Sequence, residues 1–443
     1  MATRRLLLLL LVTVIHITGV SSYNLGNETQ LRTDLLTNYS LKSRPDGVTS
    51  ISLVFNLLTI NQLVTRTQTF SISGYFTVIW NDTRLGWTPA AYSGIGFLFA
   101  DETEIWRPSL VVKNAIDNLD VIANDNIPMR VTNEGKIFWN PPGIYTTHCD
   151  IDITYYPFDS QECSVVVQSW GYNLRELDLF KYGTGVETAE FERNGEWNLN
   201  KAYSERSEKT QDVDAETYAA VSFVFKLQRK PDYYGINIIL PVVVLSILSA
   251  LVFVLPPDSG EKMGYSLTVL LSFAVFLTLI ADSMPTTSRN TSYMAVYLAV
   301  ILCLSGLSVL LTVIVLDFHY REGEVPYWLG QITRVVIMPL VCSRGCRKSG
   351  TVSASNSDID GEETQFKGIQ NIRSKANQKR SLGDFSDRAS SAASSTAELG
   401  WKDIARVCDT LFFRFYLIVI SLISLIFFLV LGLERSSNYT AEL

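Results

Sequence analysis

The sequence predicts a multidomain membrane protein: an extracellular all-β sandwich followed by a four-helix transmembrane bundle with a partly disordered cytoplasmic loop. Three observations predict this fold class. The 443 residues are 47% hydrophobic, which is too apolar for an ordinary soluble enzyme. After the first residues, 23–230 alternate short apolar and polar runs, whereas the long apolar runs all follow residue 233. A Ser-rich, charged stretch at 350–400 precedes the last of these runs.

The first residues have the layout of a secretory signal peptide. Arg4 and Arg5 precede an apolar core, and small residues end at Ser22. This order is typical of segments that are removed after translocation. A retained membrane anchor is the alternative, but the apolar run is short and a segment with the pattern of a folded domain follows directly. We therefore expect residues 1–22 to be a signal peptide.

Residues 23–230 have the pattern of a single β-sandwich. Runs such as "ISLVFNLLTINQLV", "TFSISGYFTVIW" and "AAVSFVFKLQRK" alternate apolar and polar residues, and Gly, Pro, Asn and Asp separate them. Alternation of period two with turn signals at this spacing predicts an all-β sandwich. The formal net charge of −7 argues against a protein that binds nucleic acid.

Four later runs are long enough to span a bilayer, because a helix needs about 20 apolar residues to cross the hydrocarbon. They are residues 234–255, 264–280, 293–316 and 411–433. With a translocated N-terminus, the predicted segments are transmembrane helices one to three at 231–316, a cytoplasmic loop at 317–408, the fourth helix at 409–433 and an extracellular tail at 434–443.

Glycosylation sequons agree with this topology. All five N-x-Ser/Thr sites fall outside 317–408, in segments that the topology places outside the cell. Such sites are modified only in the lumen of the secretory pathway. The predicted glycosylation sites are Asn27, Asn38, Asn81, Asn290 and Asn438.

The six cysteines divide by compartment. Only Cys149 and Cys163 lie in the oxidising extracellular part, so they can pair within the chain only with each other. Closing this 15-residue loop stabilises the fold by about 3 kcal/mol on the chain-entropy estimate. Cys303 lies in a span, and Cys342, Cys346 and Cys408 lie inside. The motif "CSRGC" beside basic residues is either a site of acylation at the membrane or a pair of ordinary free thiols.

Two helices are expected next to the inner membrane surface. The segment at 325–341 is amphipathic and contains Arg334, which suits a helix lying along the membrane, with a buried packing helix as the alternative. The segment "AELGWKDIARVCDTLFFRFY" runs into the fourth span without a helix breaker. One continuous helix is therefore expected from the cytoplasm into the membrane.

The stretch "CDIDITYYPFDSQEC" places thirteen residues between two cysteines, with an aromatic-Pro-Phe-Asp sequence near its centre. It resembles the signature loop of the pentameric ligand-gated ion channels, the Cys-loop receptors. The motifs "WNDTRLGW", "PPGIY", "SWGY", "NGEW" and "YYGINIILP" are most similar to the nicotinic acetylcholine receptor branch. The likeness covers about 40–340 and 396–433.

The resemblance implies a subunit of a homo- or hetero-pentamer in the plasma membrane, with both termini outside, gated by a small-molecule ligand and conducting ions. The sandwich would then be the ligand-binding domain. The loop tip from Tyr155 to Phe158 would rest on the membrane domain and pass ligand-driven motion to the pore. Pro157, which follows an aromatic residue, is a candidate for a cis peptide bond.

The second span has a stripe at helical spacing. Positions that step by three or four share one helix face, and here the steps give Glu261, Gly264, Thr268, Leu271, Val275, Leu279 and Asp282. Sequence alone permits a buried bundle helix, but charges at both ends of a spanning helix usually face water. If five copies surround an axis, as the resemblance implies, Glu261 and Asp282 form acidic rings that select permeant cations, and Leu271 and Val275 form an apolar constriction.

Three features qualify this pore. Lys262 has to point away from the axis for Glu261 to act as an acidic ring. Gly264 stands where the nicotinic pattern has a hydroxyl residue, and bulky Tyr265 lies beside it. These differences leave the conductance and the ranking of cations open.

The resemblance also implies a ligand site built from five aromatic positions at a subunit interface, which hold a quaternary ammonium by cation–π contacts. Trp170 and Tyr218 match two positions on one subunit, which we call the principal face, with core aromatics of the sandwich as the alternative. Tyr75 matches the position on the neighbour, the complementary face. The remaining two principal positions fall on Lys113 and Gln211, and the family's adjacent cysteine pair is replaced by Val213 and Asp214.

These differences predict that the chain does not form an ordinary acetylcholine site with its own principal face. It is either an accessory subunit or a homomer gated by another ligand, with an anionic or zwitterionic group to pair with Lys113. A non-conducting receptor subunit is the rival. No catalytic residues, metal ligands or cofactor-binding motifs stand out, and the histidines are only His16, His148 and His319, so an enzyme is not expected.

Overall fold

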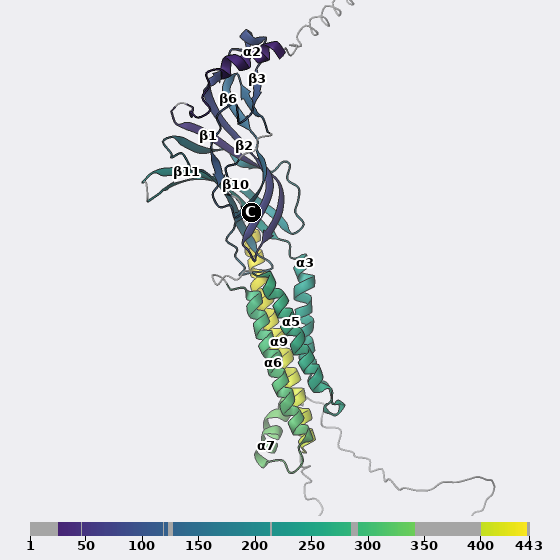
Figure 1. Ribbon diagram of the computed structural model, residues 1–443. Coiled ribbons are helices and arrows are strands. Elements are labelled where there is room, and N and C mark those ends of the chain that lie inside the picture. Colours follow the sequence, from purple (N-terminus) through teal and green to yellow (C-terminus); the bar gives the residue numbers. More distant parts are fainter. Residues whose placement is uncertain are drawn as a thin grey trace, which may run out of the picture. The chain divides into compact units, whose positions relative to one another are not determined.

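The computed structural model describes the sandwich and four long helical segments (Figure 1). The described residues are 25–45, 47–117, 119–122, 127–212, 215–284, 291–341 and 400–440. The predicted signal peptide, the predicted disordered stretch, the sequon at Asn290 and the "CSRGC" cysteines lie outside them. The chain divides into two compact units, the first with 1–244, 273–301 and 423–443 and the second with 245–272 and 302–422.

Two β-sheets in the first unit confirm the predicted sandwich. The larger, seven-stranded sheet has the order β3-β5-β6-β2-β1-β9, with β7 also paired to β2, and the smaller has the order β10-β11-β8-β4. The strands of the larger sheet are β1 (Thr49–Val64), β2 (Thr69–Gly86), β3 (Phe97–Ala100), β5 (Met129–Thr132), β6 (Glu134–Trp139), β7 (Pro142–His148) and β9 (Leu177–Glu187). The smaller sheet contains β4 (Leu110–Val112), β8 (Ser160–Ser169), β10 (Trp197–Thr210) and β11 (Thr217–Arg229).

Aromatic side chains from both sheets form the centre of the sandwich. Phe55 of β1 lies 6.0 Å from Phe223 and 5.9 Å from Phe225 of β11, measured between ring centroids. Phe76 of β2 lies 5.5 Å from Phe223. These rings are fully buried, as expected where alternate residues of two facing sheets interdigitate.

A short helix, α2 (Leu25–Leu36), precedes the first strand and was not predicted. Its only buried residue is Leu31, so it has no apolar stripe that a helical period could reveal. Arg32 fixes it to the sandwich through a 3.2 Å ion pair with Glu104. A 3-10 helix, η1 (Pro89–Tyr92), lies between β2 and β3.

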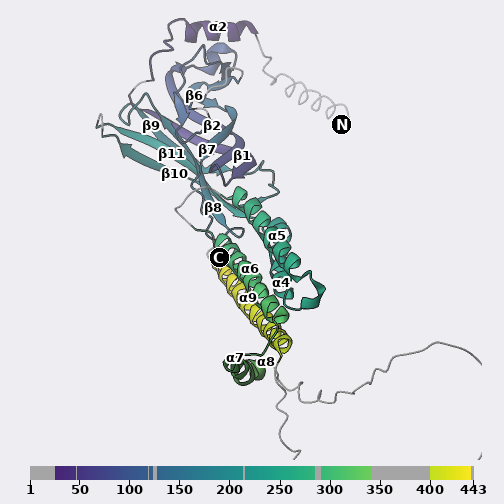
Figure 2. The ribbon, with the colours of Figure 1, turned by 60° about the horizontal axis from the view of Figure 1, so that its bottom comes forward.

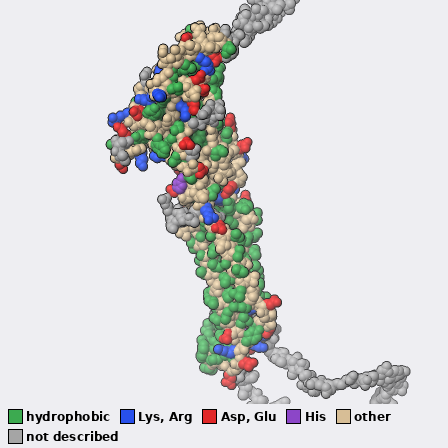
Figure 3. Space-filling model, viewed as in Figure 1, with side chains coloured by type: hydrophobic (Ala, Val, Ile, Leu, Met, Phe, Trp, Pro, Cys, Tyr) green, Lys and Arg blue, Asp and Glu red, His purple; other side chains and the backbone are tan. Residues whose placement is uncertain are grey.

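Within the part of the chain that the structure describes, four helical segments are long and apolar enough to cross a membrane: Asp232–Leu251, Lys262–Asp282, Tyr293–Tyr320 and Trp401–Gly432. Hydrophobic side chains cover most of the length of these helices, and charged ones gather on the strands and at the lower end of the helices (Figure 3). The first segment consists of α3 (Asp232–Tyr234), the π-helix η2 (Gly235–Ile239) and α4 (Leu240–Leu251). The others are α5 (Lys262–Ser283), preceded by the 3-10 turn η3 (Pro257–Ser259), then α6 (Tyr293–Tyr320) and α9 (Trp401–Thr440).

In the second unit these helices pack side by side (Figure 2). Phe253, which follows α4, lies 5.1 Å from Tyr416 of α9 between ring centroids, and the Tyr416 hydroxyl donates to the Leu304 carbonyl of α6 at 3.0 Å. The predicted inner helix is present as α7 (Tyr327–Ile332), η4 (Thr333–Ile337) and α8 (Met338–Val341). The predicted continuous last helix is confirmed from Trp401, and it extends to Thr440, beyond the expected end of the span.

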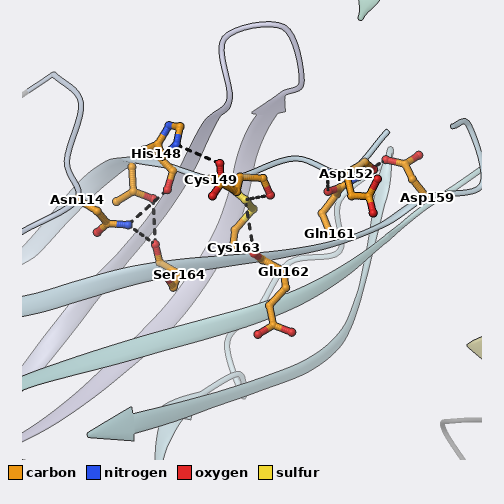
Figure 4. Close-up of a disulfide and its surroundings, with 11 residues drawn as sticks. Asn114, His148, Cys149, Asp152, Asp159, Gln161, Glu162, Cys163 and Ser164 are labelled. Atoms are coloured by element: carbon orange, nitrogen blue, oxygen red, sulfur yellow. Dashed lines mark hydrogen bonds and ion pairs between the residues drawn. A yellow bond between two sulfur atoms is a disulfide. The ribbon is translucent and has the colours of Figure 1, made fainter. Parts of the chain in front are cut away.

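The predicted disulfide joins Cys149 to Cys163 (Figure 4). Cys163 lies on β8, and Cys149 directly follows β7. The intervening loop is also closed by polar contacts, since the Gln161 amide donates to the Asp152 carbonyl at 2.8 Å. The Tyr156–Pro157 peptide bond is cis, as the sequence suggests.

Replacing Cys149 and Cys163 together with serine is expected to destabilise the sandwich by about 3 kcal/mol. A domain of 150–250 residues changes its Tm by about 2–4 °C per kcal/mol, so the unfolding temperature of the purified receptor should fall by about 6–12 °C. The matched control is Cys303→Ser, because Cys303 is an exposed free cysteine on α6. An unchanged melting temperature in the double variant would contradict the prediction.

Candidate functional site

The smaller sheet brings Trp170 and Tyr218 of the predicted principal face together. Trp170 directly follows β8, and Tyr218 lies near the start of β11. Ala220 pairs with Gln168 in this antiparallel ladder, so the register continued by two residues places Tyr218 opposite Trp170. The Trp170 side chain is 52% exposed. Trp170 is therefore available at the surface and is not a core aromatic of the sandwich.

Lys113 lies on the same sheet, directly after β4. Its backbone N–H donates to the Val166 carbonyl of β8 at 2.8 Å, and its Nζ donates to Gln168 Oε1 at 2.9 Å. Gln168 is buried and lies two residues before Trp170. The lysine ammonium is thus held on β8 close to the end of the strand that carries Trp170. A positive charge at this place opposes the binding of a cationic ligand.

Gln211 lies at the tip of the β10–β11 hairpin, just beyond the last paired residues, Thr210 and Thr217. Its backbone N–H donates to the Glu216 carbonyl at 2.9 Å, and its carbonyl accepts the N–H of Ala215 at 3.0 Å. The side chain is exposed. Val213 and Asp214 lie outside the described residues.

Tyr75, assigned to the complementary face, lies on β2 of the larger sheet. It lines a cavity of about 240 Å³ with Asn56, Leu57, Glu187, Ala189 and Glu190. Gly74 allows this local packing, because a Cβ there would lie 2.3 Å from the Asn56 carbonyl oxygen. Burial and, to a lesser degree, the Glu190 carboxylate raise the pKa of Tyr75.

The two halves of the predicted ligand site therefore differ in charge. On the predicted principal face the Lys113 ammonium contacts Gln168, two residues before Trp170, whereas on the predicted complementary face Glu187 and Glu190 line a cavity with Tyr75. Glu187 and Glu190 were missed by sequence reasoning. No local sequence pattern reveals their role, because only the fold places Glu187 of β9 and Tyr75 of β2 on the two sides of Asn56 in β1.

On α5, the predicted stripe is exposed along its length in the single chain. Leu271, Val275 and Leu279 are 64%, 52% and 63% exposed. The polar and small members of the stripe are exposed as well: Glu261, Gly264, Thr268 and Asp282. The buried positions lie on the other face of the helix: Lys262, Ser266, Val269, Phe273 and Ile280. One face of α5 therefore packs against other parts of the same chain, and the face with the stripe is exposed in the single chain.

Lys262 points away from the stripe, as the pore interpretation requires. Its side chain is fully buried, and Nζ lies 2.5 Å from Asp409 Oδ1 of α9. A buried charge needs such a partner, because an unpaired ammonium in an apolar interior is strongly disfavoured. Glu261, one residue earlier, remains exposed.

The two other departures from the family pattern, Gly264 and Tyr265, lie on different faces of α5. The Tyr265 hydroxyl donates to the Leu248 carbonyl at 3.0 Å, so its bulk lies against α4 and not on the stripe. Gly264 is on the stripe, and a Cβ added there would meet no atom within 4 Å. Packing within the chain therefore does not require a glycine at this position.

The base of the sandwich contacts the start of α6. Tyr155, in the disulfide loop, lies 5.5 Å from Tyr293 between ring centroids, and the Tyr293 N–H donates to the Thr154 carbonyl at 3.0 Å. Both residues belong to the first compact unit. This contact agrees with the expectation that the loop tip rests on the membrane domain.

A buried ion pair beside this loop was not predicted. Arg229, the last residue of β11, donates from Nε to Asp159 Oδ1 at 2.8 Å and from Nη1 to Glu196 Oε1 at 2.7 Å. Its guanidinium also lies 4.2 Å from the Trp197 ring centroid. Burial alone would lower the pKa of Arg229, but the Asp159 carboxylate, together with Tyr234 and Glu196, outweighs burial and raises it. Arg229 therefore stays charged.

Comparisons with known proteins agree with this geometry. Residues 28–231 match the family model of the neurotransmitter-gated ion-channel ligand binding domain, and 238–393 match that of the neurotransmitter-gated ion-channel transmembrane region. The chain is 33% identical over 341 residues to the acetylcholine receptor subunit beta of Xenopus laevis, an alignment that covers 73% of this chain and 69% of that subunit.

Two further relatives are matched over a smaller share of their length. The neuronal acetylcholine receptor subunit alpha-3 of Carassius auratus is 36% identical over 294 residues, which cover 64% of this chain and 57% of that subunit. The acetylcholine receptor subunit alpha-type acr-16 of Caenorhabditis elegans is 33% identical over 316 residues, which cover 70% of this chain and 63% of that subunit. The chain thus spans less than two thirds of these two relatives.

Proposed function

Because the chain belongs to the neurotransmitter-gated ion-channel family as a nicotinic receptor-like subunit, we propose that α5 lines a cation-selective pore and that acetylcholine does not open it through this chain's own principal face. The family consists of membrane-spanning receptors and not of enzymes. Its members form pentamers that are gated by small-molecule ligands and conduct ions. Which subunits and which ligand this chain itself associates with belongs to the proposal.

The charge arrangement at the start of α5 supports cation selectivity. Glu261 is exposed, whereas Lys262 is buried and neutralised by Asp409. In a ring of subunits, the carboxylates of Glu261 and Asp282 would then attract cations at the two ends of the stripe. Lys262 would not cancel the Glu261 ring, because Asp409 neutralises it. The single observation that carries the selectivity proposal is that the Glu261 side chain is exposed on the stripe whereas the Lys262 side chain is buried against α9.

The polarity of the two half-sites supports a complementary role in ligand binding. Glu187 and Glu190 beside Tyr75 favour a cationic ligand group, and Lys113 beside Trp170 opposes one. The chain would therefore lend its Tyr75 face to a neighbour whose principal face has a complete aromatic cage. The second candidate is a homomer, in which a zwitterionic ligand places its ammonium near Tyr75 and its anionic group near Lys113.

The predicted topology belongs to the same proposal. The sandwich and both termini would lie outside the plasma membrane, and 317–408 inside. Asn38 and Asn81 are exposed on the sandwich, which suits glycosylation there. Two further predicted glycosylation sites are Asn27 and Asn438. The Asn27 side-chain amide donates a hydrogen bond to the Ser93 hydroxyl at 2.5 Å, and Asn438 lies near the end of α9.

Replacing Lys113 with tyrosine is expected to improve the binding of a quaternary ammonium to receptors made of this chain alone. One aromatic face contributes about 0.5–2 kcal/mol to such a site, so the affinity should rise about 2- to 30-fold. The measurement is equilibrium binding of radiolabelled acetylcholine to cell-surface receptors. Lys42→Tyr is the control, because Lys42 is an exposed lysine outside both faces.

The same cells test the gating proposal. Acetylcholine should evoke no current from the unaltered chain expressed alone, and it should evoke current when a nicotinic subunit with a complete principal face is co-expressed. A cation current evoked by acetylcholine from the unaltered chain alone would overturn the proposal. An equal gain of affinity in Lys42→Tyr would show that Lys113 has no special role.

A further inference from the structure

The turn between β1 and β2 carries an arginine, and backbone contacts anchor the turn. The two strands remain paired up to Val64 and Thr69, so Arg66 lies in a four-residue turn at the end of a long hairpin. Gln68 has a φ of 55° in the left-handed region, and its carbonyl accepts the N–H of Cys149 at 2.9 Å. The turn is therefore attached to the disulfide loop as well as to its own strands.

Arg66 forms an ion pair with the end of α5. Its Nη1 lies 3.7 Å from Asp282 Oδ1, and both residues belong to the same compact unit. The side chains of Arg66 and Asp282 are 58% and 75% exposed. An exposed pair of this kind contributes little to the stability of the fold. Its effect is instead on the electric field around Asp282, because the two charges remain within a Debye length of each other.

Asp282 is the carboxylate at the far end of the exposed stripe from Glu261. We propose that Arg66 sets the effective charge of this end of the pore: the paired guanidinium offsets the Asp282 carboxylate, and a movement of the β1–β2 turn releases it. The inference rests on the proposed role of α5 as the pore lining. It assigns to one arginine of the sandwich a direct influence on the rate of cation passage.

The Arg66–Asp282 pair joins a hairpin of the sandwich to a spanning helix. By contrast, His148 and Asp150 form a 3.6 Å contact within the base of the sandwich. Any displacement of the hairpin relative to α5 therefore changes the separation of Arg66 from Asp282. Conductance and the position of the hairpin become linked through this one contact.

The first test compares Arg66→Gln, Asp282→Asn and the double variant in single-channel recordings with potassium as the permeant cation. All three are made in a Leu271→Ser background, which is expected to conduct without ligand because hydroxyl groups hydrate the apolar constriction. Arg66→Gln should raise the inward conductance by about 1.2- to 2-fold, and Asp282→Asn should lower it. In the presence of Asp282→Asn, the effect of Arg66→Gln should disappear.

Arg175→Gln is the matched control, because Arg175 is an exposed arginine in the connection between β8 and β9. It removes the same charge and should leave the conductance unchanged. If Arg66→Gln raised the conductance equally with Asp282 present and with Asp282→Asn, the inference would be overturned. An effect of the same size in Arg175→Gln would also overturn it.

A second test does not depend on current. Arg66→Cys and Asp282→Cys are combined and treated on intact cells with a reagent that joins two thiols over about the length of an arginine side chain. After digestion of the purified receptor, mass spectrometry should find the peptide that contains residue 66 joined to the peptide that contains residue 282, whereas each single cysteine variant should carry the reagent by one end only. If Leu271→Ser gives no current but the crosslink forms, the pore proposal fails and the pairing stands. If no crosslink forms in surface receptors, the pairing itself is wrong.

Discussion

Replacing Leu271 with serine is expected to give a standing cation current in the absence of any ligand. Leu271 is 64% exposed on the stripe of α5, where five copies would surround the axis. An apolar constriction closes by excluding water, so a ring of hydroxyl groups favours the hydrated, open state. A shift of about 1.4 kcal/mol in the closed–open equilibrium already raises the ratio of open to closed channels tenfold, and five substitutions act together.

The measurement is whole-cell current with ion substitution. The reversal potential should follow the cation gradient and not the chloride gradient, which tests the charge selectivity as well. Leu310→Ser on α6 is the matched control, because Leu310 is 62% exposed and lies outside the stripe. A reversal potential that follows chloride would refute cation selectivity, and a standing current of equal size in both variants would refute the assignment of the pore face.

Replacing Arg229 with methionine is expected to cause the largest loss of stability among single substitutions in the sandwich. The change leaves the Asp159 carboxylate buried without its partner, and breaking a buried ion pair in this way costs about 3–5 kcal/mol. Domains are stabilised by only about 5–15 kcal/mol in total. Receptors with Arg229→Met should therefore reach the cell surface in much smaller amounts, measured by surface biotinylation.

Two further variants separate the lost pair from a general effect of losing an arginine. Arg206→Met removes an arginine whose side chain is 28% exposed, against 3% for Arg229, and which lies 2.7 Å from Asp178, so it should cost less stability than Arg229→Met. Combining Arg229→Met with Asp159→Asn removes the unpaired charge and should recover part of the surface expression. Equal losses in Arg206→Met and Arg229→Met would contradict the role of burial.

The features that could be predicted from sequence have local signals. The spans are visible as runs of apolar residues, the disulfide as two cysteines in one compartment, and the α5 stripe as residues spaced three or four apart. The strand pattern likewise predicts the sandwich, because alternation of period two reports which side of a strand is buried. In each case the residues that form the feature are near one another in the chain.

The features that were missed depend on residues that only the fold brings together. Arg229 and Asp159 are 70 residues apart, and neither has a distinctive sequence context. Glu187 joins Tyr75 only because β9 pairs with β1 in parallel. The short helix α2 buries a single leucine, so its packing leaves no periodic signal.

The ion pair between Lys262 and Asp409 has a consequence for biosynthesis. Its two members are 147 residues apart, and Asp409 lies in α9, which is synthesised after α5. Until α9 inserts, the ammonium of Lys262 has no carboxylate from this helix and stands next to Glu261. A chain that ends before α9 would therefore carry an uncompensated lysine at the start of α5, where it would offset the charge of the neighbouring Glu261. Completion of the C-terminal helix thus determines the charge of a site that was synthesised much earlier.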